Sequence, residues 1–263
     1  MADSRWRAEV DDGLVLVTLI PVAGQARLLA GLAVAEHLAH AGFPTGRPVR
    51  AADGAVVVLV DEGVVAVVRD VPGRPLDPND PLDQQWWGDM LGAAHRALTG
   101  FGDPRVTRLA RLNPEGAHLD IAPWLRPTVL GALAAVTRLT VTDQLTYGVL
   151  HGDPAPDVFR IDPETGRTGL VDWRAAATGP LVYDLAAAVG YAGGMAAAAE
   201  LIDGYLAAAP VPAEEAEAAL PVLLRYRLAE RLDALARAAR GGGAPDWAAL
   251  AATRSAIEEL EEL

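Results

Sequence analysis

The segment HGDPAPDVF, residues 151–159, decides how this chain folds. The apolar run GVL leads into it, and a second apolar run, GLV, follows shortly after. The first run leads to Asp153 and the second to Asp172. Residues 159–173 have the pattern of a hairpin closed by the four-residue loop PETG. Each of the two apolar runs is predicted to be a strand that leads to an aspartate, and the hairpin lies between these aspartates. We therefore expect the carboxylates of Asp153 and Asp172 to face one cleft.

Two convergent carboxylates are suited to phosphoryl transfer. One orients or deprotonates the attacking hydroxyl, and the other holds Mg²⁺ against the nucleotide phosphates. The structural alternative is that Asp153 and Asp172 accept hydrogen bonds from backbone N–H groups of their own turns. Considered alone, each aspartate is better explained by the structural role. The order and spacing of the two together favour the catalytic role.

The composition limits the function. The 263 residues carry a formal net charge of −13, which excludes nucleic acid as a partner and is compatible with a cationic one. The absence of cysteine excludes disulfides and thiolate metal sites, and all 22 basic residues are arginine. No apolar run approaches the ~20 residues of a membrane span. The N-terminal residues lack the apolar centre of a signal peptide, so we expect a cytoplasmic protein without membrane contact.

The apolar pattern changes along the chain. Runs rich in β-branched residues at 14–20, 54–60 and 64–71 predict strands, and helical spacing over 27–41 predicts a helix. The proline-rich segment 72–81 is the predicted boundary between two lobes. Helical patterns then predominate, at 82–101, 127–147, 182–208, 213–239 and 246–262.

Three motifs in this order, HGDPAPDVF, TGLVDW and GPLVYDLA, resemble those of the aminoglycoside phosphotransferase and choline kinase-like family, which is related to protein kinases. Upstream, AEHLAHAGFPTGRPV and VVRDVPGRPL are similar to a helix and a hinge of that family, so the resemblance spans about residues 14–206. It implies an α+β, two-lobed, protein-kinase-like fold. The small β-rich N-lobe would be residues 1–71 with a hinge at 68–72, and the larger helical C-lobe, residues 72–263, would carry the catalytic loop and the hairpin.

The resemblance also implies roles for individual residues. Asp153 matches the catalytic aspartate that accepts the proton of the substrate hydroxyl, and Asp172 matches the metal-binding aspartate. His151 matches the histidine that orders the loop, and Asp184 matches the aspartate that braces it. Adenine would bond to backbone groups of the hinge residues Arg69, Asp70 and Val71. The implied cofactor is Mg²⁺ with ATP or GTP.

The chain departs from the family pattern in its N-lobe and its loop. Val158 stands where the family has an asparagine that binds the second metal. The neighbouring Asp157 either replaces that ligand, since Mg²⁺ favours oxygen, or points to solvent. Thr18 stands where a strand usually supplies a cation, which leaves Glu36 on the helix without its usual partner unless Arg27 reaches in. Few residues precede the first predicted strand, so we expect a reduced N-lobe.

The leading prediction is a phosphotransferase that moves the terminal phosphate of ATP or GTP to a hydroxyl of a small molecule, antibiotic-like or a metabolite. Two alternatives stay open: a degenerate kinase-fold partner protein in a biosynthetic complex, and a kinase acting on Ser/Thr of a modified peptide. The apolar edge at 56–60 also predicts a covering partner such as a second copy. Candidates to line the acceptor site follow residue 182, namely Tyr183, Tyr191, Asp203 and Tyr205.

Overall fold

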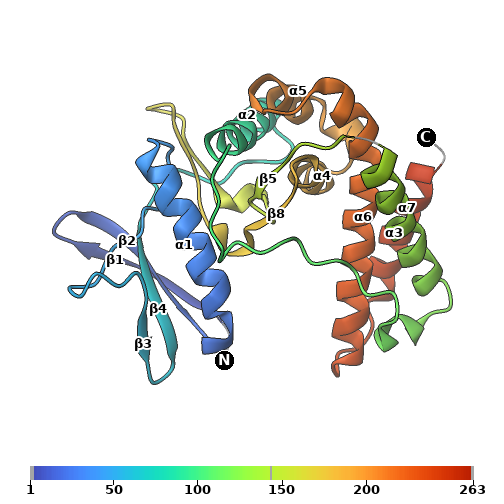
Figure 1. The fold of residues 1–263 in the computed structure, drawn as a ribbon, viewed down its shortest axis with the longest axis horizontal. Helices are drawn as coiled ribbons and strands as arrows, with labels where there is room; N and C mark the ends of the chain where they lie inside the picture. Colours follow the sequence, from blue (N-terminus) through green and yellow to red (C-terminus); the bar gives the residue numbers. More distant parts are fainter. Residues whose placement is uncertain (1–2, 143, 262–263) are drawn as a thin grey trace.

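The computed structural model describes residues 3–142 and 144–261. The N-terminal part is a four-stranded antiparallel sheet packed against helix α1, and the larger C-terminal part is mostly helical (Figure 1). The predicted α+β, two-lobed architecture is therefore confirmed. The residue at which one lobe gives way to the other, placed at 71 by the sequence, stays a prediction.

The sheet contains a strand that the sequence analysis missed. β1 (Ser4–Val10) pairs along its whole length with β2 (Gly13–Ile20). β1 is almost fully exposed and carries three charged residues, so a search for apolar runs does not detect it. β4 (Gly63–Arg69) and β3 (Val58–Val60) complete the order β1-β2-β4-β3. One strand therefore precedes β2, and the reduced size of the N-lobe stays a prediction.

The predicted strand 54–60 is wrong over its first half. A turn forms there, in which the Gly54 N–H donates to the Ala51 carbonyl and the Asp53 carboxylate accepts from the Ala55 N–H. Gly54 has φ +86°, a left-handed conformation that ends regular strand geometry. Only the three residues of β3 continue as a strand, and their side chains are exposed.

Helix α1 (Gln25–His40) packs between the sheet and the segment that follows Asp172. Its Leu28 and Leu32 pack on the sheet residues Val64 and Ala66. On its other side, a Cβ added to Gly31 would lie 2.6 Å from the backbone oxygen of Trp173. Glycine at this position lets the helix backbone approach the 173–175 turn closely.

The helices of the C-terminal part differ from the predicted ones mainly at their ends. The predicted helix 182–208 is two helices, because Gly193 and Gly194 have φ of +96° and +106° and break it. The predicted helix 127–147 ends at Thr142, and a strand begins at Tyr147. The helices are α2 (Pro81–Ala97), α3 (Leu125–Thr142), α4 (Val182–Tyr191), α5 (Ala199–Ala208), α6 (Ala213–Arg240) and α7 (Trp247–Glu261).

Two short strand pairs hold the segments that the sequence singled out. β5 (Tyr147–Leu150) pairs with β8 (Ala177–Pro180), and β6 (Phe159–Asp162) pairs with β7 (Arg167–Leu170) as the predicted hairpin. The loop 151–158 leaves β5 and enters β6, so it lies between the two pairs.

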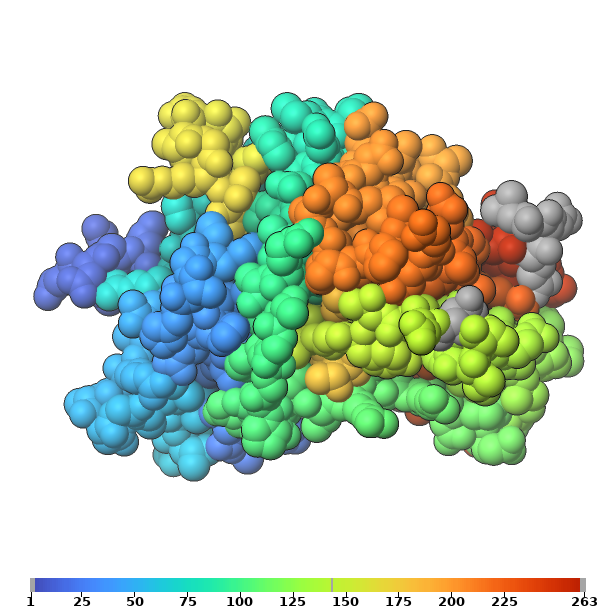
Figure 2. Space-filling model, turned by 45° about the horizontal axis from the view of Figure 1, so that its top comes forward, coloured from blue at the N-terminus to red at the C-terminus, as the bar shows by residue number. Residues whose placement is uncertain are grey.

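A long connection between α2 and α3 runs over the surface. Its residue Leu109 donates its N–H to the carbonyl of Thr178 in β8, and Phe101 stacks on His37 of α1 with ring centroids 4.5 Å apart. Figure 2 shows this connection in green, beside the blue helix α1. Across residues 3–142 and 144–261, every helix is too short or too polar to cross a lipid bilayer.

Candidate active site

The loop that carries Asp153 is fixed by Asp184, in the first turn of α4. The fully buried Asp184 carboxylate accepts from the backbone N–H of His151 at 2.6 Å and of Gly152 at 3.0 Å, and His95 Nε2 lies 3.1 Å away. Burial acts to raise the pKa of Asp184, but the hydrogen bond and charge of His95 outweigh it, so this pKa is lowered. The ionised carboxylate therefore holds the two peptide groups that precede Asp153.

The two residues before Asp153 each have a structural reason to be there. Gly152 has φ +86°, and a Cβ on it would lie 2.1 Å from the backbone oxygen of Ala175. His151 is buried, and its Nε2 lies 2.9 Å from the carbonyl oxygen of Val171. His151 thus connects the loop 151–158 to the residue before Asp172, and its ordering role stays a prediction.

Asp153 is exposed, and its Oδ1 accepts a hydrogen bond from the Tyr191 hydroxyl at 2.6 Å. Burial, followed by this hydrogen bond, raises the pKa of Tyr191 to about 12, so the hydroxyl remains a donor at neutral pH. Within the part of the chain that the structure describes, Oδ2 of Asp153 has no hydrogen-bond partner. One oxygen is thus held by Tyr191, and the other is available to a substrate hydroxyl.

Asp172 is held by two arginines. Arg174 donates to it from Nε at 2.7 Å, and Arg5 of β1 donates from a terminal nitrogen at 2.6 Å. Burial raises the pKa of Asp172, but the hydrogen bonds and charges of Arg174 and Arg5 outweigh it and lower this pKa to about 2. Asp172 has φ +66°, a left-handed conformation that costs a non-glycine residue energy and that often marks a functional position.

The protein side chains near Asp172 supply only part of the ligand set that Mg²⁺ needs. Asp172 and Asp157 line one cavity and offer carboxylate oxygens, the donors that Mg²⁺ favours. Across residues 3–142 and 144–261, no three acidic or histidine side chains form a cluster able to hold a metal ion. A metal here would therefore take its remaining ligands from nucleotide phosphates and water, and Arg5 would have to release Asp172.

The predicted hinge residues line the same cavity. Arg69, Asp70 and Val71 all face it, and its volume is about 190 Å³. The N–H groups of Arg69 and Asp70 already donate to the carbonyls of Arg47 and Leu14. This volume is below the roughly 300–1,000 Å³ of most small-molecule sites. Because Arg5 reaches across it to Asp172, we attribute the small volume to that contact.

Val158, which replaces the family's asparagine, packs against the main hydrophobic core and also faces the hinge cavity. Its apolar side chain is thus accounted for by packing. Asp157 is exposed, so the structure leaves both predicted alternatives for it open. Glu36 pairs with Arg50 at 2.5 Å on the surface and does not line the hinge cavity. Thr18 is buried and faces the cavity, where it lies opposite Arg5 in the β1–β2 register.

Three cavities meet around the two aspartates. The hinge cavity includes Asp172, and a central cavity of about 580 Å³ includes both Asp172 and Asp153. A third and wider cavity of about 990 Å³, which we call the arginine cavity, includes Asp153 and Tyr191. It is bounded by the first turn of α1, residues 110–112, α4 and α6, and it takes its name from Arg27, Arg111, Arg227, Arg231 and Arg237.

Of the four side chains predicted to line an acceptor site, Tyr191 lines this cavity and the other three do not. The Tyr183 hydroxyl donates to Glu230 at 2.7 Å, beneath the cavity wall. Tyr205 is fully buried and bonds to His95 at 2.9 Å, and Asp203 is exposed on α5.

Arg27 and Arg69 were named from the sequence, but the other basic residues of the site were not. Arg5 lies on an undetected strand, and Arg174 lies two residues after Asp172 without a motif of its own. Arg227 and Arg231 are four residues apart on α6, which places them on one face of a helix. That spacing is the one signal in the sequence that indicated an arginine-lined surface.

Comparisons of the sequence with known proteins identify relatives of this chain. The sequence model of the family described as "Phosphotransferase enzyme family" matches residues 2–220. A homoserine kinase of Acidiphilium cryptum is 31% identical over 211 residues, which is 74% of this chain and 64% of that protein. A homoserine kinase of Granulibacter bethesdensis is 30% identical over 225 residues, which is 77% of this chain and 68% of that protein. The chain thus spans about two thirds of the length of these relatives.

Solved structures show the same fold at low sequence identity. An amicoumacin kinase in complex with AMP-PNP, Ca²⁺ and Ami superposes with a TM-score of 0.75 at 18% identity, over 98% of this chain and 85% of that one. A choline kinase of Streptococcus pneumoniae superposes with a TM-score of 0.71 at 13% identity, over 98% of this chain and 90% of that one. These superpositions confirm the predicted two-lobed, protein-kinase-like fold.

Proposed function

Because the chain belongs to the phosphotransferase enzyme family, as its motifs predicted, we propose that it transfers the terminal phosphate of ATP or GTP to a hydroxyl of a small molecule. The observation that supports this most is the central cavity, which both Asp153 and Asp172 line. It connects the hinge cavity at Asp172 with the arginine cavity at Asp153. A nucleotide in the first and an acceptor in the second would meet between the two carboxylates.

In this proposal Asp153 is the catalytic base. Its free Oδ2 accepts the proton of the acceptor hydroxyl while the hydroxyl oxygen bonds to the terminal phosphorus and the nucleoside diphosphate leaves. Tyr191 orients the carboxylate through Oδ1, and Asp184 fixes the peptide groups before it. The loop is thus organised before the substrate arrives, which reduces the entropy lost in reaching the reactive geometry.

The nucleotide would bind in the hinge cavity, with its base near Val71 and its phosphates toward Asp172. Asp172, with Asp157, would hold Mg²⁺, which when bound neutralises phosphate charge. Arg5 faces Thr18 across β1 and β2, at the position where the family resemblance places a cation. We infer that Arg5 leaves Asp172 and contacts the nucleotide phosphates, while Arg174 remains beside Asp172.

The first acceptor to test is homoserine, because the relatives at 30% and 31% identity are homoserine kinases. The experiment combines nucleotide binding with product detection. Purified protein is titrated with ATP and with GTP, each with and without Mg²⁺, and phosphorylated product is measured by ³¹P NMR with homoserine and other hydroxyl compounds. The proposal expects binding that requires Mg²⁺ and is lost in Asp172→Ala. If neither nucleotide binds the wild type, the proposal is wrong.

A second candidate function, nucleotide-independent binding of a partner, is favoured by one observation. Both oxygens of Asp172 are bonded to arginines, and the hinge cavity is small. If Arg5 and Arg174 stay bound to Asp172, this carboxylate is not available to a metal and the cavity does not admit a nucleotide. Nucleotide titration of the wild type separates the two candidates, because a cavity that Arg5 holds closed binds no nucleotide, and binding gained in Arg5→Gln would identify that contact as the cause.

A further inference from the structure

The arginine cavity has a charge opposite to that of the whole chain. The chain carries a net charge of −13, yet five arginines and only three carboxylates line this cavity. The carboxylates are Asp153, Glu230 and Asp233. Because low-dielectric walls concentrate an electrostatic field in a cleft, this local excess governs what the cavity attracts more than the net charge does. The sequence-based expectation of a cationic partner therefore does not apply at this site.

Two of the three carboxylates are already neutralised from within the fold. Glu230 accepts from Arg227 at 2.9 Å and from the Tyr183 hydroxyl at 2.7 Å. The Arg227 guanidinium also lies 4.9 Å from the centre of the Tyr183 ring, which adds a cation–π contact. This group is mostly buried, so Arg227 and Glu230 form a fixed part of the wall.

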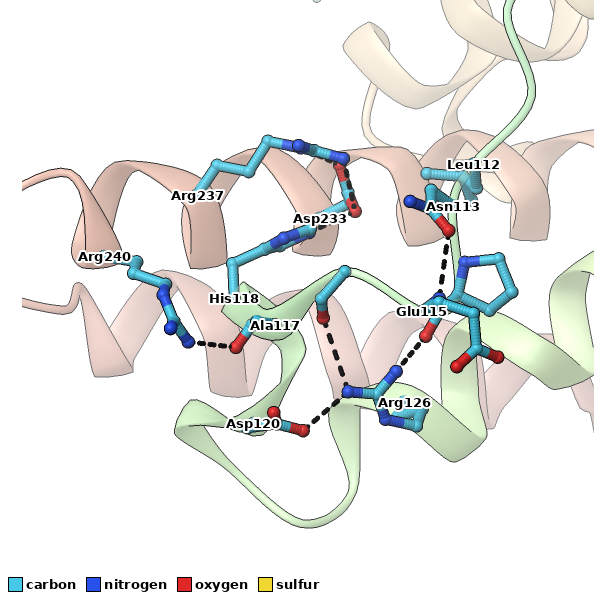
Figure 3. A network of polar contacts seen from close by, with 12 residues as sticks. Leu112, Asn113, Glu115, Ala117, His118, Asp120, Arg126, Asp233, Arg237 and Arg240 are labelled. Atoms are coloured by element: carbon cyan, nitrogen blue, oxygen red, sulfur yellow. Dashed lines mark hydrogen bonds and ion pairs between the residues drawn. The ribbon is translucent and has the colours of Figure 1, made fainter.

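Asp233 lies between two cationic or potentially cationic groups. Its Oδ1 is 2.6 Å from His118 Nε2, and its Oδ2 accepts from Arg237 Nε at 2.7 Å. Figure 3 shows Asp233 on α6 directed at both partners, with Arg126 and Arg240 fixing the neighbouring 114–120 segment. A cationic substrate group would have to displace these contacts in order to reach the Asp233 carboxylate.

The remaining three arginines of the cavity are Arg27, Arg111 and Arg231. Across residues 3–142 and 144–261, Arg27, Arg111 and Arg231 make no ion pair or side-chain hydrogen bond. They come from α1, the 110–112 segment and α6, so they approach the cavity from three sides. Arginine presents several N–H donors in a planar fork, which matches the two oxygens of a carboxylate. Three such groups without a protein partner are suited to an anionic ligand.

We propose that the acceptor bound in the arginine cavity carries a carboxylate in addition to its hydroxyl. Arg231 and Arg111 bind the carboxylate, and the hydroxyl points to Asp153 Oδ2. Of these three arginines, Arg27 also lines the central cavity, through which the acceptor would meet the nucleotide. This inference rests on the proposed function for the role of Asp153, but its charge preference depends on the arginines alone.

The test measures binding separately from turnover. Hydroxy acids of increasing length, including homoserine and 4-hydroxybutanoate, are titrated by NMR into the wild-type protein, each beside its own amide and with choline as a cationic probe. We expect at least one acid to bind at least about tenfold more tightly than its amide, a difference of ~1.4 kcal/mol. This preference should weaken as salt rises, because exposed charges are screened.

Two variants identify the residues responsible. Arg231→Gln and Arg111→Gln should each remove most of the preference for the acid, while Arg167→Gln, on the exposed hairpin and outside the cavity lining, should keep it. All three side chains are exposed, so the variants are expected to fold. Equal affinity for acid and amide overturns the proposal, as do tighter binding of choline and no binding of any acid at about 10 mM.

The outcome is separable from that of the proposed function. An acid preference that depends on Arg231, in a protein that transfers no phosphate, supports the arginine cavity and contradicts the phosphotransferase proposal. Phosphate transfer to neutral or cationic hydroxyl compounds, with no preference for acids, supports the phosphotransferase proposal and contradicts the carboxylate acceptor.

Discussion

Replacing Asp184 with asparagine should destabilise the protein strongly, although the side chain keeps its size. The carboxylate is fully buried and interacts with three groups, the backbone N–H of His151, that of Gly152 and the His95 ring. Asparagine offers one acceptor oxygen and turns an NH₂ group toward the remaining donors. At least one buried N–H then lacks a partner, and charge-assisted bonds become neutral ones, a loss of about 3 kcal/mol.

The effect is measured by urea and thermal unfolding of wild type and Asp184→Asn. For a chain of this size, about 3 kcal/mol corresponds to a fall in Tm of roughly 6–12 °C. Asp203→Asn is the matched control, because that aspartate is exposed on the neighbouring α5 and should change stability by less than about 0.5 kcal/mol. If Asp184→Asn unfolds within about 0.5 kcal/mol of the wild type, Asp184 does not brace the loop and the reasoning is refuted.

Three further predictions follow from the same geometry. Because the pKa of Asp184 is lowered from 3.8 in the folded state, its stabilisation is complete above that pH and is lost as the pH falls below it. Wild type should therefore lose more stability than Asp184→Asn between about pH 5 and pH 3, and equal losses in unfolding titrations would contradict this. Gly152→Ala should cost more than about 3 kcal/mol in urea unfolding, because its Cβ would lie 2.1 Å from the Ala175 oxygen at φ +86°. A Gly166→Ala control has open space around it and should cost clearly less, so equal losses would oppose this reading. Arg5→Gln should weaken nucleotide binding by roughly tenfold or more, since one charged hydrogen-bond donor to phosphate is removed. Tighter binding in calorimetry would instead mean that Arg5 only blocks the cavity.

The sequence predicted the parts of the fold that rest on apolar pattern and on the order of the motifs. The hairpin over 159–173, the positions of Asp153 and Asp172 and the split into a β-rich and a helical part required only strand length, turn residues and the order of motifs. β1 was missed because its residues are exposed and partly charged, so they form no apolar run. It is a strand because it pairs with β2 along its whole length, and that pairing is not visible in the strand propensity of its own residues. The break at Gly193 and Gly194 was missed because alanine on both sides favours helix.

The sequence predicted the acidic residues of the candidate site but missed most of its arginines. Asp153, Asp172 and Asp184 stand in motifs whose order identifies them. Arg5 and Arg111 reach the site only because the fold brings distant segments together. The net charge of −13 does not reveal the arginines of this cavity, because a sum over the chain says nothing about where they gather.

The most direct test of the central claim compares phosphate transfer with nucleotide binding in wild type and Asp153→Asn. Transfer from ATP or GTP to the best acceptor is followed by ³¹P NMR under saturating conditions, and nucleotide Kd is measured by calorimetry. If Asp153 is the catalytic base, kcat should fall by roughly 10²–10⁴-fold, while nucleotide Kd stays unchanged because Asp153 lies outside the hinge cavity. Transfer by Asp153→Asn at the wild-type rate would contradict the account.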